Sequence, residues 1–190
     1  MRELVYTGFM SLDGVVDSPG GGPGEEHRGG GWVAHDFLPE AFALKAEELA
    51  DTTALLFGRR SYEAFAPVWR ESDDHASYKD LPKYVLSTTL RDDALVDGWG
   101  PTTILRSNDD VADLKKSEGG GIFIHGSAEL ARRLSDAGLI DRYNLLVFPV
   151  LLGAGKSVFS TTDRDKQRLR LRESETYKNG VVKMIYDVVR

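Results

Sequence analysis

The chain has no cysteine and only 4 histidines among its 190 residues. Without cysteine it has no thiol nucleophile, no disulfide framework, no iron–sulfur cluster and no Cys-ligated zinc. With so few histidines, a metal site would consist mostly of carboxylates. We therefore predict that the protein uses no metal.

Long apolar runs and an excess of cations are also missing. No apolar run approaches the roughly 20 residues that a transmembrane helix needs, and the segment Met1–Tyr6 has no apolar core of a secretory signal. We therefore expect no membrane association and a cytoplasmic protein. Lys and Arg number 24 against 30 Asp and Glu, which gives a net charge of −6. A nucleic-acid surface needs clustered cations, so we expect no nucleic-acid partner, whereas a small phosphorylated ligand can still bind at local basic groups.

What the sequence contains is an alternation of short apolar runs and helical patterns. The length fits one domain, and we predict a single domain over residues 1–190. Helices and strands alternate in the first part of the chain, which is typical of parallel βαβ units, whereas the last strands follow one another without long helices. The sequence therefore predicts an α/β fold with a mixed, mostly parallel sheet and antiparallel C-terminal strands. The expected strands are 4–9, 53–57, 84–87, 103–105, 122–124, 145–148, 167–172 and 181–189, and the expected helices are 39–50, 61–65, 110–116 and 128–137.

A long irregular stretch, 13–36, contains two glycine clusters. Long loops without secondary structure are uncommon in compact domains and usually form lids, binding loops or disordered segments. Because Trp32 and Phe37 close the stretch with aromatic side chains, we favour a mobile lid over a disordered insertion. Trp32 itself either stacks on a planar ligand or packs the loop.

Three strand ends carry residues suited to anions. At His125-Gly126-Ser127-Ala128-Glu129, an apolar strand leads directly into a helix, with Ser127 expected to cap the helix. The free N–H groups and positive end of such a helix bind anions. The alternative is an ordinary strand-to-helix junction.

Gly58-Arg59-Arg60-Ser61 repeats this design with two guanidinium groups, whose forked donors suit phosphate. The alternative is that both arginines are simply solvated. Ser87-Thr88-Thr89 supplies hydroxyl groups at a third strand end. Ligands of open α/β sheets bind outside the carboxyl ends of the strands, so we predict one crevice for a ligand with several phosphates, such as a dinucleotide.

Ser11-Leu12-Asp13-Gly14 follows the first strand. Asp13 either orients a polar substrate or forms a turn.

Taken in order, these segments resemble the dihydrofolate reductase-like superfamily, and most closely the C-terminal reductase domain of the bifunctional riboflavin-biosynthesis deaminase-reductase in its stand-alone form. The resemblance implies a three-layer sandwich that binds NADPH, often as a homodimer. The segments that carry it are Ser11–Gly14, Gly58–Glu63, Leu86–Thr89, His125–Leu130 and Pro149–Gly155.

The resemblance also implies site residues. It assigns the cofactor to Phe9 and Met10 for the nicotinamide, Gly58, Arg59, Arg60 and Ser61 for phosphate, Ser87 and Thr88 for the adenosine 2′-phosphate, and Gly126, Ser127, Ala128 and Glu129 for the pyrophosphate. It assigns the substrate to Thr7, Asp13 and Trp32. Asp13 and Asp36 are the candidates for binding the substrate or relaying a proton.

The sequence departs from dihydrofolate reductases at three places. Thr88 stands where an arginine is usual, with Arg91 as a candidate substitute, and His125 replaces the first of two adjacent glycines. The pterin-binding acid is matched only imperfectly, by Glu40. The imperfect match to this acid argues against folate reduction. The zinc-dependent deaminase half is absent because its metal ligands need cysteine.

The function that we expect is an NADPH-dependent reductase that transfers a hydride to a small pterin-like or ribosylaminopyrimidine-like heterocycle, for example 5-amino-6-(5-phosphoribosylamino)uracil. Two alternatives remain open. One is a dinucleotide-binding module without turnover, and the other is a protein that binds a phosphorylated sugar at a single anion site.

Overall fold

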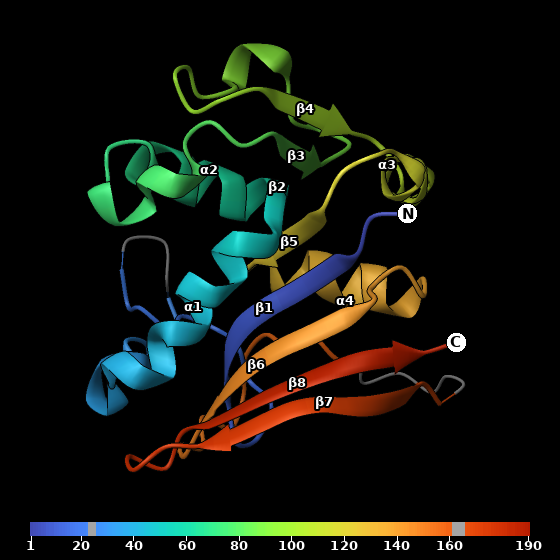
Figure 1. Cartoon of the computed structure of the whole chain (residues 1–190). Helices are drawn as coiled ribbons and strands as arrows, with labels where there is room; N and C mark the ends of the chain where they lie inside the picture. Colours follow the sequence, from blue (N-terminus) through green and yellow to red (C-terminus); the bar gives the residue numbers. More distant parts are fainter. Residues whose placement is uncertain (23–25, 161–165) are drawn as a thin grey trace.

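The computed structural model describes residues 1–22, 26–160 and 166–190. Its centre is an eight-stranded sheet in the order β4-β3-β2-β5-β1-β6-β8-β7 (Figure 1). The strands are β1 (Leu4–Ser11), β2 (Thr52–Gly58), β3 (Lys83–Leu86), β4 (Thr102–Leu105), β5 (Gly121–His125), β6 (Arg142–Phe148), β7 (Arg168–Thr176) and β8 (Val182–Val189).

The pairing of the strands confirms the predicted mixed sheet. Strands β1 to β6 pair in parallel, whereas β8 runs antiparallel to both β6 and β7. A tight turn can join only antiparallel strands, as it does between β7 and β8, whereas parallel neighbours need a crossover.

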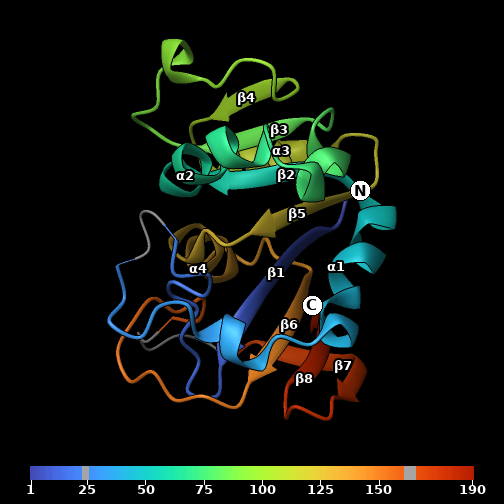
Figure 2. The same ribbon diagram turned by 90° about the vertical axis from the view of Figure 1, so that its left-hand side faces the viewer.

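Helices cover both faces of the sheet (Figures 1 and 2). On one face, α1 (Pro39–Asp51) and α2 (Arg59–Trp69) pack against residues such as Val5 and Phe148. On the other face, α3 (Asn108–Lys116) and α4 (Ala128–Asp136) pack against Leu4 and Tyr6. The alternation of Leu4, Val5 and Tyr6 between two cores follows from the two-residue period of a strand. Short 3-10 helices lie at Trp32–Asp36, Asp73–Tyr78 and Asp92–Ala94.

Most elements differ from the prediction by a few residues at a boundary, and the largest differences are at one helix and one strand. The helix expected over 61–65 begins at Arg59, directly after β2, and continues through Pro67 to Trp69. The strand expected over 167–172 continues to Thr176, past a bulge between Leu171 and Glu173. In the glycine-rich stretch 13–36, residues 23–25 lie outside the described part of the chain.

Among the described residues, no helix is both long and apolar enough to cross a membrane. The same residues contain no cluster of three or more His, Asp and Glu side chains that could hold a metal ion.

Candidate functional site

Three turns lie at the carboxyl ends of adjacent strands, as predicted. Strand β2 lies between β3 and β5, and all three run in parallel. The turns at Gly58–Ser61, Ser87–Thr89 and Gly126–Glu129 therefore form one row. In Figure 2, β2 and β5 point to the same side, where α2 and α4 begin.

Two of these turns are joined by hydrogen bonds from backbone N–H groups to the hydroxyl groups of Ser127 and Ser61. The Gly58 N–H donates to Ser127 Oγ at 3.1 Å, and the Ser127 N–H donates to Ser61 Oγ at 3.1 Å. The N-termini of α2 and α4 are thereby fixed next to each other.

The expectation that Ser127 caps α4 is wrong, because its hydroxyl accepts from the Gly58 N–H across the gap between the turns. Gly126 and Ser127 both have left-handed backbone, with φ of 59° and 51°. This conformation costs a residue with a side chain on the order of 1–2 kcal/mol. Backbone of this kind often occurs at ligand sites.

Within the described chain, neither α2 nor α4 has a side-chain cap at its N-terminus. By contrast, α3 begins with a capping box in which Ser107 and Asp110 satisfy the backbone. Uncapped N–H groups at two adjoining helix ends, together with the helix dipoles, form an anion site.

Arginine side chains border this anion site. Arg59 donates to Glu63 at 2.7 Å and to Thr89 Oγ1 at 2.8 Å, which links the turn after β2 to the end of β3. Arg60 lies 3.6 Å from Glu129, and its side chain is 84% exposed. Both arginines are in the first turn of α2, and Arg60 is the more exposed of the two.

The third turn is held by its own serine. Ser87 is buried, and its hydroxyl accepts from the N–H groups of Thr89 and Leu90. Thr88 is exposed. Arg91, the candidate substitute for the missing arginine, is engaged with Asp93 through two hydrogen bonds.

The end of β1 extends beyond its neighbour β5. The pairing of β1 with β5 ends at Thr7 opposite His125, whereas its pairing with β6 continues to Ser11. Phe9 and Met10, the expected nicotinamide contacts, lie in this extension and are partly buried. The extension starts at the level of the Gly126 turn.

A buried polar cluster below Phe9 was missed by the sequence analysis. Glu48 of α1 accepts from the Thr7 hydroxyl at 2.9 Å and from Asn144 Nδ2 at 2.7 Å. Lys45 donates to Thr7 and lies 3.4 Å from Glu48. The register places Thr7 opposite Asn144, so both side chains face α1.

Lys45 is the member of this cluster that reaches the surface. Its side chain is 23% exposed, compared with 2% for Glu48, and its Nζ lies 5.3 Å from the centre of the Phe9 ring. Burial lowers the pKa of Lys45, while the Glu48 carboxylate acts in the opposite direction. Lys45 is therefore a partly exposed donor of this cluster that also contacts the Phe9 ring.

The expected acid, Glu40, is exposed and lies 3.7 Å from Lys178. The sequence did contain a signal for the burial of Glu48. Glu48 follows Ala41 and Leu44 at helical spacing, and all three lie on the buried face of α1. A carboxylate within the apolar stripe of a helix could have indicated a buried polar contact.

His125 ends β5 beside the same cluster. It is 9% exposed, and its Nε2 has no hydrogen-bond partner among the described residues. The Trp69 and Tyr78 rings lie 5.7 Å and 5.3 Å from its ring. Burial, reinforced by Lys45 and His75, holds the pKa of His125 well below its usual value, so the ring is neutral at pH 7.

Asp13 has the geometry of the turn-forming alternative. Its carboxylate accepts from the Ser11 hydroxyl at 2.5 Å and from the N–H groups of Gly153 and Leu152 at 2.7 Å and 3.2 Å. The hydrogen bonds from Ser11 and Gly153 lower the pKa of Asp13 to about 2. It is therefore ionised at neutral pH and has no proton to donate.

Trp32 and Asp36 lie at the end of the glycine-rich stretch. Trp32 is buried, packs edge-on against Phe148 at 5.3 Å, and donates from Nε1 to the Asp17 carbonyl. This geometry matches the alternative in which Trp32 packs the loop. Asp36 is partly buried, and its backbone carbonyl accepts from Asn179 at 2.6 Å.

The described part of the glycine-rich stretch lies on the segment that follows β6. Lys156 pairs with Asp17 at 3.0 Å, and its carbonyl accepts from the Val16 N–H at 2.9 Å. The lid remains a prediction.

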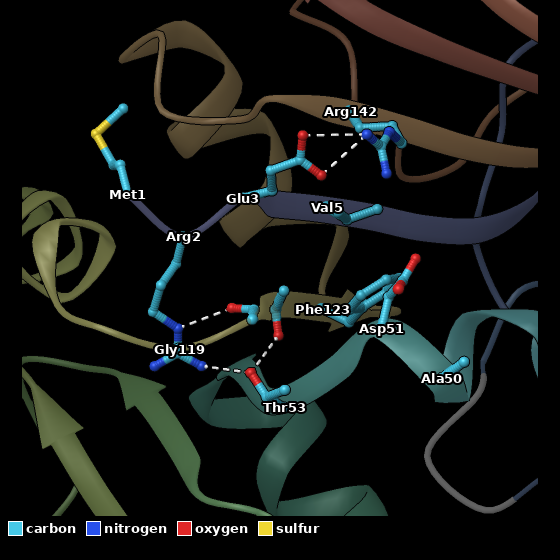
Figure 3. Close-up of a pocket in the computed structure, with 12 residues that line it drawn as sticks. Met1, Arg2, Glu3, Val5, Ala50, Asp51, Thr53, Gly119, Phe123 and Arg142 are labelled. Atoms are coloured by element: carbon cyan, nitrogen blue, oxygen red, sulfur yellow. Dashed lines mark hydrogen bonds and ion pairs between the residues drawn. The ribbon is translucent and has the colours of Figure 1, made fainter.

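Two cavities lie away from the three turns. One of about 300 Å³ lies at the amino-terminal ends of β1, β2 and β5 (Figure 3). Its arginines are already engaged, Arg2 with Gly120 and Thr53, and Arg142 with Glu3. A smaller cavity of about 150 Å³ lies between α1 and the C-terminal strands. Neither is lined by residues of the turns, so we place the candidate site at the carboxyl ends of the strands.

Comparison with known proteins identifies the family. Residues 2–183 match the family described as the RibD C-terminal domain. The chain belongs to this family. The match confirms the resemblance to the reductase domain of riboflavin biosynthesis.

One curated relative is the uncharacterized protein YyaP of Bacillus subtilis (strain 168), which is 30% identical over 97% of this chain and 94% of its own length. Solved structures of lower identity share the fold. A putative riboflavin biosynthesis protein from Shewanella sp. PV-4 is 19% identical, with a TM-score of 0.68 over the full length of both chains. A pyrimidine reductase-like protein from Corynebacterium diphtheriae is 13% identical, with a TM-score of 0.62 over all of this chain and 92% of the other.

RibD of Acinetobacter baumannii is 14% identical, with a TM-score of 0.65, and this chain corresponds to 58% of it. These likenesses confirm the predicted dihydrofolate reductase-like α/β fold.

Proposed function

We propose that this protein is a reductase that uses NADPH to reduce a small heterocycle. The observation that carries the proposal is the pair of uncapped helix N-termini that Ser61 and Ser127 join, with Arg59 and Arg60 beside them. A pyrophosphate bridges two such helix ends readily, because it carries two negative charges and accepts several N–H groups.

The residues present fit NADPH. The turn Gly126–Glu129 would hold the pyrophosphate together with Gly58–Ser61, and Thr88 would lie near the adenosine 2′-phosphate with Ser87 shaping its turn. Phe9 and Met10 would contact the nicotinamide. When bound, the cofactor supplies the hydride, and the protein supplies binding and orientation.

The substrate would lie beside Phe9, within reach of the Lys45 ammonium. Lys45 would donate a hydrogen bond to a ring carbonyl or nitrogen, and Glu48, Thr7 and Asn144 would keep its Nζ in position. A pyrimidine such as 5-amino-6-(5-phosphoribosylamino)uracil fits such a donor, and the family match and the pyrimidine reductase-like neighbour support this class. Lys45 would donate the proton, whereas the low pKa of Asp13 argues against that residue.

Calorimetric titration with NADPH and NADH tests the proposal. The double variant Arg59→Ala/Arg60→Ala should bind NADPH at least about tenfold more weakly than the wild type, because hydrogen bonds from charged groups contribute about 1.5–3 kcal/mol. The control is Arg132→Ala/Arg133→Ala, which removes two exposed guanidinium groups from α4 away from the turns and should leave the affinity unchanged. Equal affinity in the two double variants would contradict the assignment of Arg59 and Arg60.

Turnover separates the reductase from the two alternatives. NADPH oxidation in the presence of a pyrimidine or pterin supports the reductase. NADPH binding without oxidation across such a panel would indicate a dinucleotide-binding module. Competition by ribose 5-phosphate alone would indicate a sugar-phosphate binder.

A further inference from the structure

His125 is a buried polar side chain to which the proposed function gives no role. It is the last residue of β5, and 9% of its surface is exposed. Its Nε2 has no hydrogen-bond partner among the residues that the structure describes. A buried polar group without a partner costs stability, so its presence in a folded protein needs an explanation.

Packing alone does not account for an imidazole at this position. The Trp69 and Tyr78 rings lie 5.7 Å and 5.3 Å from the His125 ring and meet it edge-on. The Phe65 ring lies beside the next residue, because a Cβ on Gly126 would come within 3.2 Å of it. A phenyl ring would suit these aromatic neighbours as well as an imidazole does. What histidine adds is a polar nitrogen.

His125 belongs to a row of polar side chains that crosses three strands. In the register of the sheet, Thr7 of β1 lies opposite both His125 of β5 and Asn144 of β6. Residues in register project to the same face of a sheet. Thr7 and Asn144 both donate to Glu48 of α1. His125 is therefore the member of this polar row that does not bond to Glu48.

The polar row lies at the level where the candidate site begins. The pairing of β1 with β5 stops at Thr7 and His125, whereas β1 continues beside β6 to Ser11. Gly126, the first residue of the turn that would hold the pyrophosphate, follows His125 directly. Phe9, which would contact the nicotinamide, lies two residues beyond Thr7 and so projects to the same face. His125 is thus adjacent to both proposed cofactor contacts.

Lys45 supplies a donor next to the polar row. It donates to Thr7, the residue opposite His125. Burial, and after it the Lys45 ammonium, holds the pKa of His125 well below its usual value. A neutral imidazole has one N–H and one unprotonated nitrogen that accepts, whereas an ammonium only donates. A donor and an acceptor therefore lie near each other, on α1 and at the end of β5.

We infer that Lys45 and His125 together recognise a lactam edge, the –NH–C(=O)– group of a heterocycle such as uracil. The carbonyl oxygen accepts from the Lys45 ammonium, and the neighbouring ring N–H donates to the unprotonated nitrogen of His125. A heterocycle without this N–H leaves a buried nitrogen unpaired, and sites of this kind reject such analogues. The inference rests on the proposed function, and it makes His125 a residue that selects the substrate.

Calorimetric titration with two uracils tests this contact. One probe, 5,6-diaminouracil, has both ring N–H groups. The other, 5,6-diamino-1,3-dimethyluracil, has the same carbonyl groups and neither ring N–H. Each is titrated into protein saturated with NADP⁺, which occupies the cofactor site without supplying a hydride. We expect the wild type to bind 5,6-diaminouracil at least about tenfold more tightly than the dimethyl compound.

Variants at His125 separate the contact from packing. His125→Phe removes the acceptor and keeps a ring between Trp69 and Tyr78. We expect it to have a Tm no lower than that of the wild type, because a buried unpaired nitrogen is removed, and to lose most of the preference. His125→Gln keeps an acceptor and should retain part of the preference. The control is His75→Phe, the same substitution at a ring that stacks on Trp69 at 4.3 Å, and it should keep the full preference.

The possible results distinguish this inference from the proposed function. A wild type without the preference, a wild type that binds neither uracil, or a His125→Phe variant that keeps the preference overturns the inference alone. An equal loss of preference in His75→Phe also overturns it, because the aromatic rings rather than the His125 nitrogen would then shape the site. Absence of NADPH binding, measured separately, overturns the proposed function and this inference with it.

Discussion

At the scale of single residues, the most unusual feature is the charged pair in the core under β1. Glu48 and Lys45 are bonded to each other, and Thr7 and Asn144 supply the remaining hydrogen bonds to the carboxylate. Such a pair stabilises a protein little compared with apolar residues, but removal of one partner leaves a buried charge uncompensated. The cluster therefore behaves as a unit, which a double-mutant cycle can measure.

We predict that Lys45→Met destabilises the protein by about 3–5 kcal/mol, because the buried Glu48 carboxylate loses its counter-charge. Glu48→Leu should also be destabilising, but by less, because the Lys45 ammonium reaches the surface. The double variant should lose clearly less than the sum of the single losses, because it removes both charges. Urea unfolding of the four proteins measures the coupling, and additive losses would show that the pair does not act as a unit.

At the scale of elements, the site depends on two helices that start next to each other. Ser127 has a left-handed backbone. Its hydroxyl accepts from the Gly58 N–H and does not cap α4. The N–H groups at both helix ends are thereby left for a ligand. By contrast, Ser107 caps α3 in the ordinary way.

Ser127→Ala should therefore affect binding, and Ser107→Ala should affect stability alone. We expect Ser127→Ala to weaken NADPH binding severalfold, since the Gly58 N–H loses its acceptor and the two helix ends are no longer aligned. Ser107→Ala removes a cap worth about 1 kcal/mol but should leave NADPH affinity within twofold. Calorimetric titration and urea unfolding of both variants provide the comparison. If Ser127→Ala binds NADPH as tightly as the wild type, the hydrogen bond from Gly58 to Ser127 is not needed to align the two turns for binding.

Elements were predictable from the sequence where their signals are local. The buried strands are short apolar runs, and each strand-end turn is contiguous, so both could be predicted from neighbouring residues. The parts that were missed depend on distant contacts. Ser127 bonds to Gly58, 69 positions away, and Glu48 bonds to Asn144, 96 positions away. The cap at Ser127 was predicted wrongly because its competing partner lies on another strand.

At the scale of the whole molecule, the three turns and the exposed edge strand β7 lie far apart in the sheet. The turns follow β3, β2 and β5, whereas β7 is separated from β5 by β1, β6 and β8. A change of charge on β7 should therefore leave the turns unaltered. It follows that cofactor binding should not depend on the charged side chains of β7.

Thermal unfolding should show this independence. At a concentration one hundred times its Kd, NADPH adds about 2.7 kcal/mol to the stability of the folded state, which for a domain of this size raises Tm by about 5–10 °C. The same increase is expected in the variant Glu173→Arg/Glu175→Arg, which changes charges on β7 alone, measured against its own Tm without ligand. The Arg59→Ala/Arg60→Ala variant should show a much smaller increase at the same concentration. A β7 variant that no longer responds to NADPH would mean that β7 and the turns are coupled, because nothing else distinguishes it from the wild type at the turns.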